Sequence, residues 1–201
     1  MLAFTYQPSE RPSLKLDIGS GKRKREGFIG IDLSPGASVD VRANLEIALP
    51  FADNTFSEVW MNHVFEHLND PVRSMDEIWR VCRDGATVEI RGPHFSSPHL
   101  VWSDPTHKRG LSLSTFRYFD GTCHYAKAKF RIDSCLLIRG NTSFRDVGFR
   151  IWYWPFIVPN LLAQKLVNSS QSWVGRYERA ASRFLSFQEI RVRLSAQKGE
   201  S

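Results

Sequence analysis

The chain has 201 residues, of which 42% are hydrophobic and 24% are charged. These values are typical of one soluble globular domain with a single core, and they do not fit a disordered or fibrous protein. The three cysteines include no C-x-x-C pair, so the sequence predicts neither a disulfide framework nor a zinc knuckle. No segment approaches the ~18 consecutive apolar residues of a membrane span, and the N-terminus lacks a signal-peptide pattern. We therefore expect a cytoplasmic protein without a membrane span.

The net charge of +6 favours an anionic partner, either nucleic acid or an acidic lipid surface. Lys22-Arg23-Lys24-Arg25 is the densest cluster of positive charge. The alternative is a mildly basic enzyme whose charges are merely solvated. Composition alone leaves both interpretations open.

Short apolar segments separated by turn residues fill the first third of the chain. Residues 14–18 and 28–32 are predicted strands, and the segment between them is too short for a full covering helix. Residues 39–41 and 56–61 are the next two predicted strands. This succession favours a sheet whose strands are joined by crossovers.

Helical patterns follow the fourth predicted strand. Residues 62–68 begin a helical stretch, and Asp70-Pro71 begins a second helix. That helix carries apolar residues at helical spacing and is predicted to end at Asp84-Gly85, because glycine readily adopts a left-handed cap. Residues 87–91 are the fifth predicted strand. The expected fold is a Rossmann-like α/β fold with a doubly wound, mostly parallel sheet.

The second half of the chain is predicted to complete one domain spanning residues 1–201. Residues 14–92 form its cofactor-binding half, and residues 93–128 form a loop-rich insertion that covers the substrate. Residues 129–158 hold two closing strands, at 130–138 and 147–154, and residues 159–201 form a helical tail. The basic residues of this tail favour either a membrane-facing surface that meets a lipid-linked glycan or a helix that covers the core.

A glycine loop between two strands is the most informative feature of the sequence. Asp17 precedes Gly19-Ser20-Gly21, and Asp32 closes the next strand. Glycines let a backbone approach a ligand closely, and an acid at the end of the second strand accepts hydrogen bonds from both ribose hydroxyls. A dinucleotide fingerprint requires a third glycine and a longer spacing, so the pattern indicates a nucleoside ligand of another kind.

At this point the chain resembles the class I S-adenosylmethionine-dependent methyltransferases, and more narrowly their type-11 branch. The resemblance covers about residues 14–92. The matching blocks, in chain order, are residues 16–21, 30–32, 49–59, 63–68 and 77–85. It implies S-adenosyl-L-methionine as the cofactor.

The resemblance also implies roles for individual residues. Asp17, Gly19 and Gly21 would shape the loop around the methionine end, and Asp32 would hold the ribose hydroxyls. Asn44 and Leu45 would meet the adenine, and Asn62 and His63 would lie beside the methionine moiety. Ser20 and Leu33 complete the predicted cofactor-binding set. Asn44 stands where an aspartate is more usual in the family, although its amide still offers an acceptor oxygen.

Histidines are dense in the predicted insertion. In one interpretation His107 or His94 is a general base, with Asp104 nearby. In a second, His94, His99, Asp104 and His107 bind a divalent metal, although their spacing matches no zinc pattern and no metal ligand is assigned. In a third, these side chains only cap loops and satisfy buried backbone groups.

The resemblance implies a methyltransferase, and analogy with type-11 enzymes favours a hydroxyl of a sugar, a glycan or another small metabolite as the acceptor, with His107 as the leading base. One alternative is an RNA or DNA methyltransferase, favoured by the positive charge. Another is a non-catalytic module that binds S-adenosylmethionine and contacts a partner. The oligomeric state is not predicted.

Overall fold

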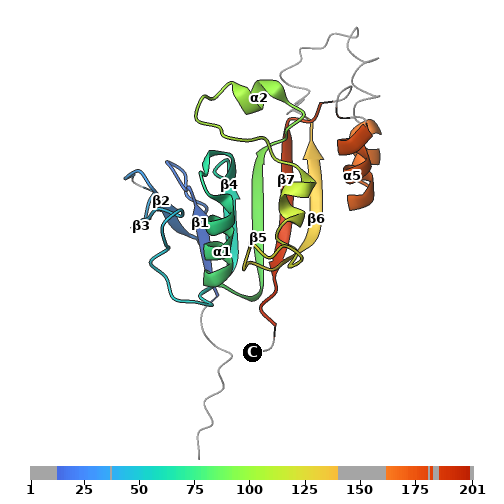
Figure 1. The fold of residues 1–201 in the computed structure, drawn as a ribbon. Coiled ribbons are helices and arrows are strands. Elements are labelled where there is room, and N and C mark those ends of the chain that lie inside the picture. Colours follow the sequence, from blue (N-terminus) through green and yellow to red (C-terminus); the bar gives the residue numbers. More distant parts are fainter. Residues whose placement is uncertain (1–12, 37, 140–161, 181, 183–185, 200–201) are drawn as a thin grey trace, which may run out of the picture.

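A computed structural model describes residues 13–36, 38–139, 162–180, 182 and 186–199. Seven strands form one sheet in the order β3-β2-β1-β4-β5-β7-β6 (Figure 1). The strands are β1 (Leu14–Ile18), β2 (Ile29–Asp32), β3 (Val41–Arg42), β4 (Phe56–Asn62), β5 (Cys82–Pro93), β6 (Phe130–Ile138) and β7 (Glu189–Ala196). The helices are η2 (Phe65–His67, a 3₁₀ turn), α1 (Pro71–Val81), α2 (Pro98–Trp102), α3 (Leu113–Arg117) and α5 (Gln171–Ala180).

The sheet is parallel except at β7. β1 pairs in parallel with β2 and β4, and β4 pairs in parallel with β5. β7 lies antiparallel between β5 and β6. The predicted Rossmann-like α/β fold is therefore confirmed. Within the described part of the chain, no helix is both long and apolar enough to cross a membrane.

Helix α1 begins where the sequence predicts and ends earlier. The Asp70 side chain accepts a hydrogen bond from the Arg73 N–H at 3.0 Å, and Pro71 occupies the first turn. The helix ends at Val81 rather than at Gly85, because the chain turns directly into β5 at Cys82. Gly85 has a φ of +70° and lies where the pairing of β5 with β4 shifts register. The glycine thus permits a strand irregularity and does not cap the helix.

Two further predictions near the site need correction. The expected strand at residues 39–41 is the two-residue strand β3 at Val41–Arg42. The expected helical stretch at 62–68 contains only η2, because His63 has a φ of +53° that a helix does not accommodate.

The C-terminal segment departs most from the prediction. Residues 171–180 are helical as expected, but residues 189–196 form β7 instead of continuing a helical tail. Ile190, Val192 and Leu194 are fully buried and alternate with more exposed residues, which is the period of a strand. The predicted strand at 147–154 lies outside the described residues. The predicted insertion contains α2 and α3.

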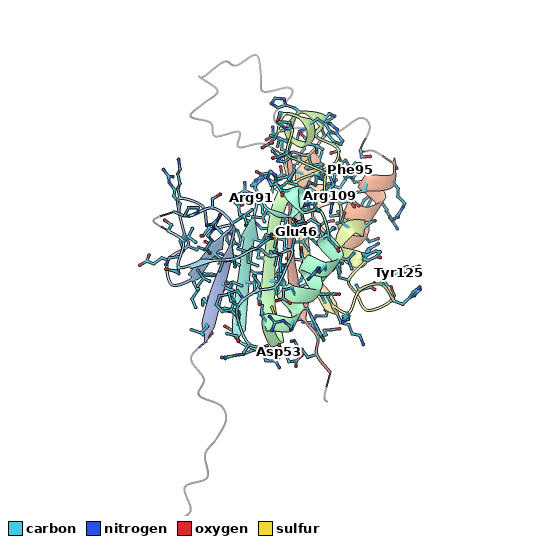
Figure 2. All side chains as sticks on the ribbon, turned by 60° about the vertical axis from the view of Figure 1, so that its left-hand side comes forward. Glu46, Asp53, Arg91, Phe95, Arg109 and Tyr125 are labelled. Atoms are coloured by element: carbon cyan, nitrogen blue, oxygen red, sulfur yellow. The ribbon has the colours of Figure 1, made fainter. Side chains whose placement is uncertain are left out.

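The carboxyl ends of the parallel strands meet at one edge of the sheet, below the segment that contains α2 (Figure 1). Figure 2 shows Arg91, Phe95 and Arg109 at this end of the molecule and Asp53 at the opposite end. Ligands of open α/β sheets bind outside the carboxyl ends of the strands. The site is therefore expected at the edge that α2 overhangs.

Candidate functional site

The loop after β1 requires glycine at two positions. Gly19 has a φ of +71°, and a Cβ there would lie 2.2 Å from the Cγ2 atom of Val64. Gly21 has a φ of +52°, and its N–H donates to Oδ2 of Asp32 at 3.0 Å. Any side chain at Gly19 would collide with the segment after β4, so glycine is needed for close packing as well as for its φ angle.

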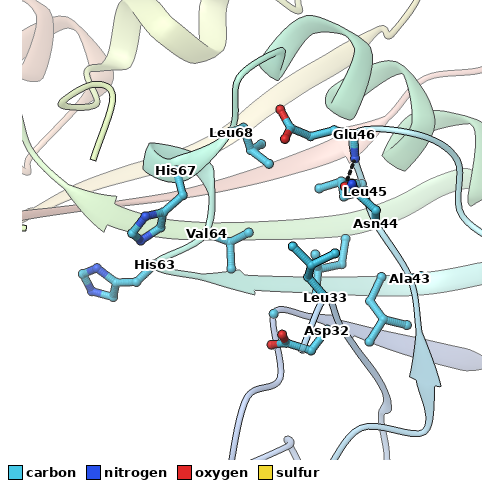
Figure 3. Close-up of a pocket in the computed structure, with 13 residues that line it drawn as sticks. Asp32, Leu33, Ala43, Asn44, Leu45, Glu46, His63, Val64, His67 and Leu68 are labelled. Carbon is cyan, nitrogen blue, oxygen red and sulfur yellow. Dashed lines mark hydrogen bonds between the residues drawn. The ribbon is translucent and has the colours of Figure 1, made fainter. Parts of the chain in front are cut away.

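A cavity of about 300 Å³ opens beside this loop (Figure 3). The predicted residues that line it are Gly19, Asp32, Leu33, Asn44, Leu45 and His63. Glu46, Val64, His67 and Leu68 also line it, and sequence reasoning did not assign them to the site. The signal for three of them was present, because the block at residues 63–68 directly follows β4.

A second cavity, of about 310 Å³, also borders the glycine loop. Asp17, Ser20 and Asn62, all predicted, line it together with Gly19. Its remaining lining residues are Lys22, Arg23, Arg25 and Trp60. Gly19 borders both cavities, whereas Gly21 lines neither and acts through its hydrogen bond to Asp32.

The two aspartates of the predicted motif differ in their surroundings. Asp17 is almost fully buried, and burial raises the pKa of its carboxyl group. Its Oδ2 atom accepts the Arg25 N–H at 2.8 Å, which ties the end of the basic loop to β1. Asp32 accepts N–H groups from Gly21 and from Ser34 at 3.0 and 2.9 Å, which fixes its carboxylate at the cavity.

The wall formed by residues 43–46 is held by a local turn. Oδ1 of Asn44 accepts the Glu46 N–H at 2.9 Å, as Figure 3 shows. The Glu46 carboxylate in turn accepts the Asp70 N–H at 2.9 Å, and this hydrogen bond lowers the pKa of Glu46. The wall is therefore joined to the start of α1.

His63 lies between two carboxylates at the end of β4. Its Nδ1 atom bonds Oε1 of Glu66 at 3.0 Å, and its Nε2 atom bonds Oε1 of Glu189 at 3.1 Å. The hydrogen bond to Glu66 raises the pKa of His63 despite the opposing effect of burial. Because both ring nitrogens donate to carboxylates, this imidazole is suited to carry a positive charge and not to accept a proton.

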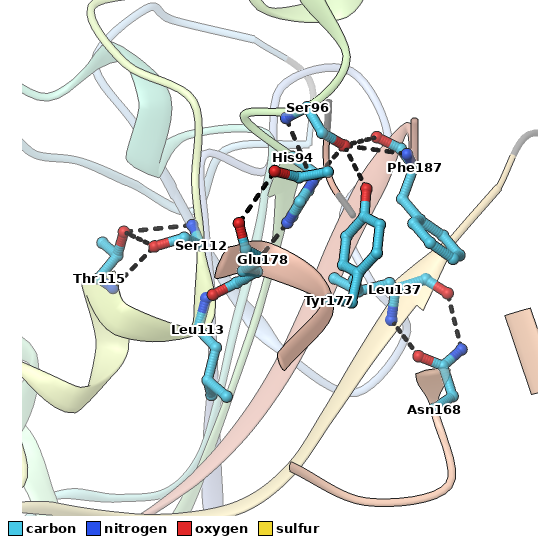
Figure 4. A network of polar contacts seen from close by, with 11 residues as sticks. His94, Ser96, Ser112, Leu113, Thr115, Leu137, Asn168, Tyr177, Glu178 and Phe187 are labelled. Carbon is cyan, nitrogen blue, oxygen red and sulfur yellow. Dashed lines mark hydrogen bonds and ion pairs between the residues drawn. The ribbon is translucent and has the colours of Figure 1, made fainter. Parts of the chain in front are cut away.

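His94, a predicted catalytic residue, is fully buried in a polar network (Figure 4). Its ring nitrogens bond the Ser96 hydroxyl at 2.8 Å and the Glu178 carboxylate at 3.3 Å. Glu178 also accepts the Leu113 N–H at 2.7 Å. His94 lines neither cavity, and this network joins the end of β5 to α5 and to the start of α3.

The structure brings the other two predicted catalytic residues together. The Nε2 atom of His107 lies 3.9 Å from Oδ2 of Asp104 and 4.0 Å from Oε1 of Glu66. The His107 ring packs edge-on against His67, with 4.7 Å between the ring centroids. Asp104 accepts the N–H and hydroxyl of Thr106. His67 lines the first cavity, so His107 lies one side chain behind the cavity wall.

Comparisons with known proteins find one matching domain family and several solved structures with a similar fold. Residues 16–90 match the family model of the type-11 methyltransferase domain, described as "Methyltransferase domain". No curated protein has a matching sequence. Several solved structures share the fold at low sequence identity.

The YcgJ protein of Bacillus subtilis is 16% identical, with 96% of this chain and 95% of that chain covered and a TM-score of 0.53. A SAM-dependent methyltransferase of Archaeoglobus fulgidus is 15% identical, with 91% and 86% covered and a TM-score of 0.55. A chain from the complex of the Haloferax volcanii Trm112 methyltransferase activator with a methyltransferase is 16% identical, with 95% and 85% covered and a TM-score of 0.55. These likenesses show the fold, and the family match over residues 16–90 is a similarity to methyltransferase domains. Residues 16–90 of this chain thus match the methyltransferase-domain family, and the described sheet has the fold of these solved structures.

Proposed function

We propose that this methyltransferase transfers the methyl group of S-adenosylmethionine to a hydroxyl oxygen of a sugar or another small metabolite. The acceptor oxygen forms a bond to the methyl carbon as the carbon–sulfur bond breaks. The electron pair of that bond stays on sulfur and yields S-adenosylhomocysteine. The hydroxyl proton must leave the acceptor, so an O-methyltransferase needs a group that activates the hydroxyl.

The first cavity suits the adenosine part of the cofactor. Within the described residues, the Asp32 carboxylate accepts N–H groups from Gly21 and Ser34, and a carboxylate has further lone pairs for the ribose hydroxyls. Asn44 and Leu45 form the wall that would contact the adenine, with Leu33 at the ribose. This assignment follows the roles that the family resemblance implies.

The second cavity suits the methionine end. Lys22, Arg23 and Arg25 border it and supply positive charge for the methionine carboxylate. Asp17 and Asn62 supply oxygen acceptors for the amino group. Gly19 separates the two cavities without a side chain, so an extended cofactor can lie across it.

The position of the His67 and His107 imidazoles supports a hydroxyl group as the methyl acceptor. His67 lines the first cavity, with His107 packed against it and the buried Glu66 carboxylate nearby. An imidazole is the side chain best suited to take a hydroxyl proton under physiological conditions, so this cluster favours an alcohol acceptor.

The arrangement of the basic loop favours a small acceptor over nucleic acid. Lys24 forms an ion pair with Asp40, with 2.7 Å between Nζ and Oδ2. The Arg25 guanidinium lies over the Trp60 ring, 4.2 Å from its centroid. Lys24 and Arg25 are thus engaged within the fold, and Lys22 and Arg23 border the second cavity, whereas nucleic-acid binding uses cations that are free to meet backbone phosphates.

The test combines calorimetry with S-adenosylhomocysteine and an acceptor screen with a labelled methyl donor. We expect binding of the product and methyl transfer to hydroxyl compounds. Replacing His67→Ala should lower turnover about 100-fold, within the usual range for loss of acid–base assistance, while His124→Ala at an exposed loop should have no effect. Methyl transfer to nucleic acid or amines alone would contradict the proposal. So would product binding without turnover on any hydroxyl acceptor.

A further inference from the structure

Three potential metal ligands converge beside the first cavity. Glu66, His67 and His107 each offer a ligand atom, and these atoms all lie within 4.8 Å of one another. The first two come from η2 and the third from the loop after α2. We propose that these three side chains bind a divalent transition-metal ion. The ligand set differs from the group His94, His99, Asp104 and His107 that the sequence suggested.

Glu66 supplies an independent reason for a bound cation. Its side chain is fully buried, and its Oε2 atom has no hydrogen-bond partner among the described residues. Its Oε1 atom is bonded to His63. A buried carboxylate oxygen without a partner is destabilising, and native structures usually satisfy such atoms with a donor, a water or an ion.

The His67 and His107 rings each form a hydrogen bond through Nδ1, as metal-binding histidines usually do through the nitrogen that does not bind the metal. Nδ1 of His107 bonds the Val101 carbonyl at 3.0 Å, which leaves Nε2 unprotonated toward Glu66. Nδ1 of His67 bonds the Thr106 hydroxyl at 2.9 Å, and that hydroxyl bonds Asp104 at 2.6 Å. Such outer hydrogen bonds fix the ring orientation and the tautomer of a ligating histidine. Asp104 thereby acts as a positioning residue for His67.

The donor set selects the kind of ion. Two imidazoles and one carboxylate suit zinc, cobalt, manganese or ferrous iron, whereas magnesium prefers oxygen ligands. Bonds of about 2.0–2.1 Å to zinc place tetrahedral ligands roughly 3.4 Å apart. Nε2 of His107 lies 4.0 Å from Oε1 of Glu66, the oxygen that also bonds His63, so the side chains must close around the ion and either carboxylate oxygen can be the ligand.

The site lies where an acceptor hydroxyl would need activation, because His67 lines the cavity. An open coordination position on the ion would hold the acceptor oxygen and lower its pKa, with the proton passing to solvent water. This role, unlike the binding itself, rests on the proposed function.

The test uses the metal alone, with full-length apo protein and no cofactor. Titration with Co²⁺ should produce a visible absorption band that saturates at one equivalent, and Zn²⁺ should displace the Co²⁺. His67→Ala and His107→Ala should each weaken Co²⁺ binding about 100-fold, since each removes a ligand. His124→Ala is the matched control, and circular dichroism verifies that each variant is folded. Mg²⁺ should show no saturable binding.

The site would be overturned if Co²⁺ produced no band, or if folded His67 and His107 variants bound it as tightly as the parent chain. Failure of the metal site and failure of the proposed function give different experimental outcomes. Metal binding without methyl transfer to any hydroxyl would contradict the proposed function and leave the site standing. Methyl transfer by chelator-treated protein that binds no Co²⁺ would overturn the site alone.

Discussion

Two groups of histidines near the same edge of the sheet have opposite surroundings. His94 is fully buried, and its polar contacts with Ser96 and Glu178 join distant parts of the fold. His67 lines the cavity with His107 packed behind it, and both lie near the buried Glu66 carboxylate, whose Oε2 atom has no hydrogen-bond partner among the described residues. A satisfied network stabilises a fold, whereas an unsatisfied one is suited to a ligand. We therefore expect changes in the two regions to affect different measurements.

The largest expected effect is on stability, at the buried network. Glu178→Ala leaves His94 and the Leu113 N–H without their shared acceptor. Loss of a buried, doubly bonded carboxylate should lower the free energy of unfolding by about 3 kcal/mol. Urea denaturation followed by circular dichroism measures this. S-adenosylhomocysteine affinity at 25 °C should be unchanged, and a parallel loss of that affinity would remove the distinction between the two regions.

The next effect is on binding, at the cavity. Asp32→Ala should weaken S-adenosylhomocysteine binding about 100-fold, or about 2.7 kcal/mol, because two charge-assisted hydrogen bonds to the ribose are lost. Calorimetry measures the change. Asp120→Ala is a matched control, since Asp120 accepts a backbone N–H from Thr122 in a similar exposed turn far along the chain from the cavities. Equal affinity in the Asp32 variant and the control would contradict the assigned role.

A smaller effect is expected at a helix cap that belongs to neither histidine group. Asp70→Ala removes the side-chain acceptor for the Arg73 N–H at the start of α1. The free energy of unfolding should fall by about 1 kcal/mol. Cobalt binding should be retained, so this variant calibrates how much general destabilisation alone alters the site. A Co²⁺ affinity that falls along with stability would undermine interpretation of the ligand variants.

The smallest effect is the pH dependence at His63, which is only partly buried and therefore partly screened. Its pKa in the folded state is raised above 6.5 by the hydrogen bond to Glu66. The stabilisation is therefore complete below about pH 6.5 and is lost as the pH rises through the folded-state pKa. His63→Gln should remove this pH-dependent component of the free energy of unfolding. An unchanged pH profile in the variant would show that the charged pair does not form.

Local sequence patterns correctly predict several strands and a helix start within residues 14–92. The predicted strands at 14–18 and 56–61 and the helix start at Asp70-Pro71 agree with β1, β4 and α1. A period-two pattern was also present at residues 189–196, where Ile190, Val192 and Leu194 alternate with polar residues. The expected helical tail includes this segment, because the short alternating pattern directly follows a longer stretch with helical spacing.

The sequence by itself determined the glycine loop, the acid at the end of β2 and the similarity of residues 16–90 to methyltransferase domains, because each depends on residues close together along the chain. The tertiary structure decided which histidine supports the fold and which reaches the cavity. His94 and Glu178, or His67 and His107, meet only after the chain folds, so no local pattern distinguishes them. Burial and the presence or absence of hydrogen-bond partners are properties of the packed chain, and they separate a structural histidine from one that is available to a ligand.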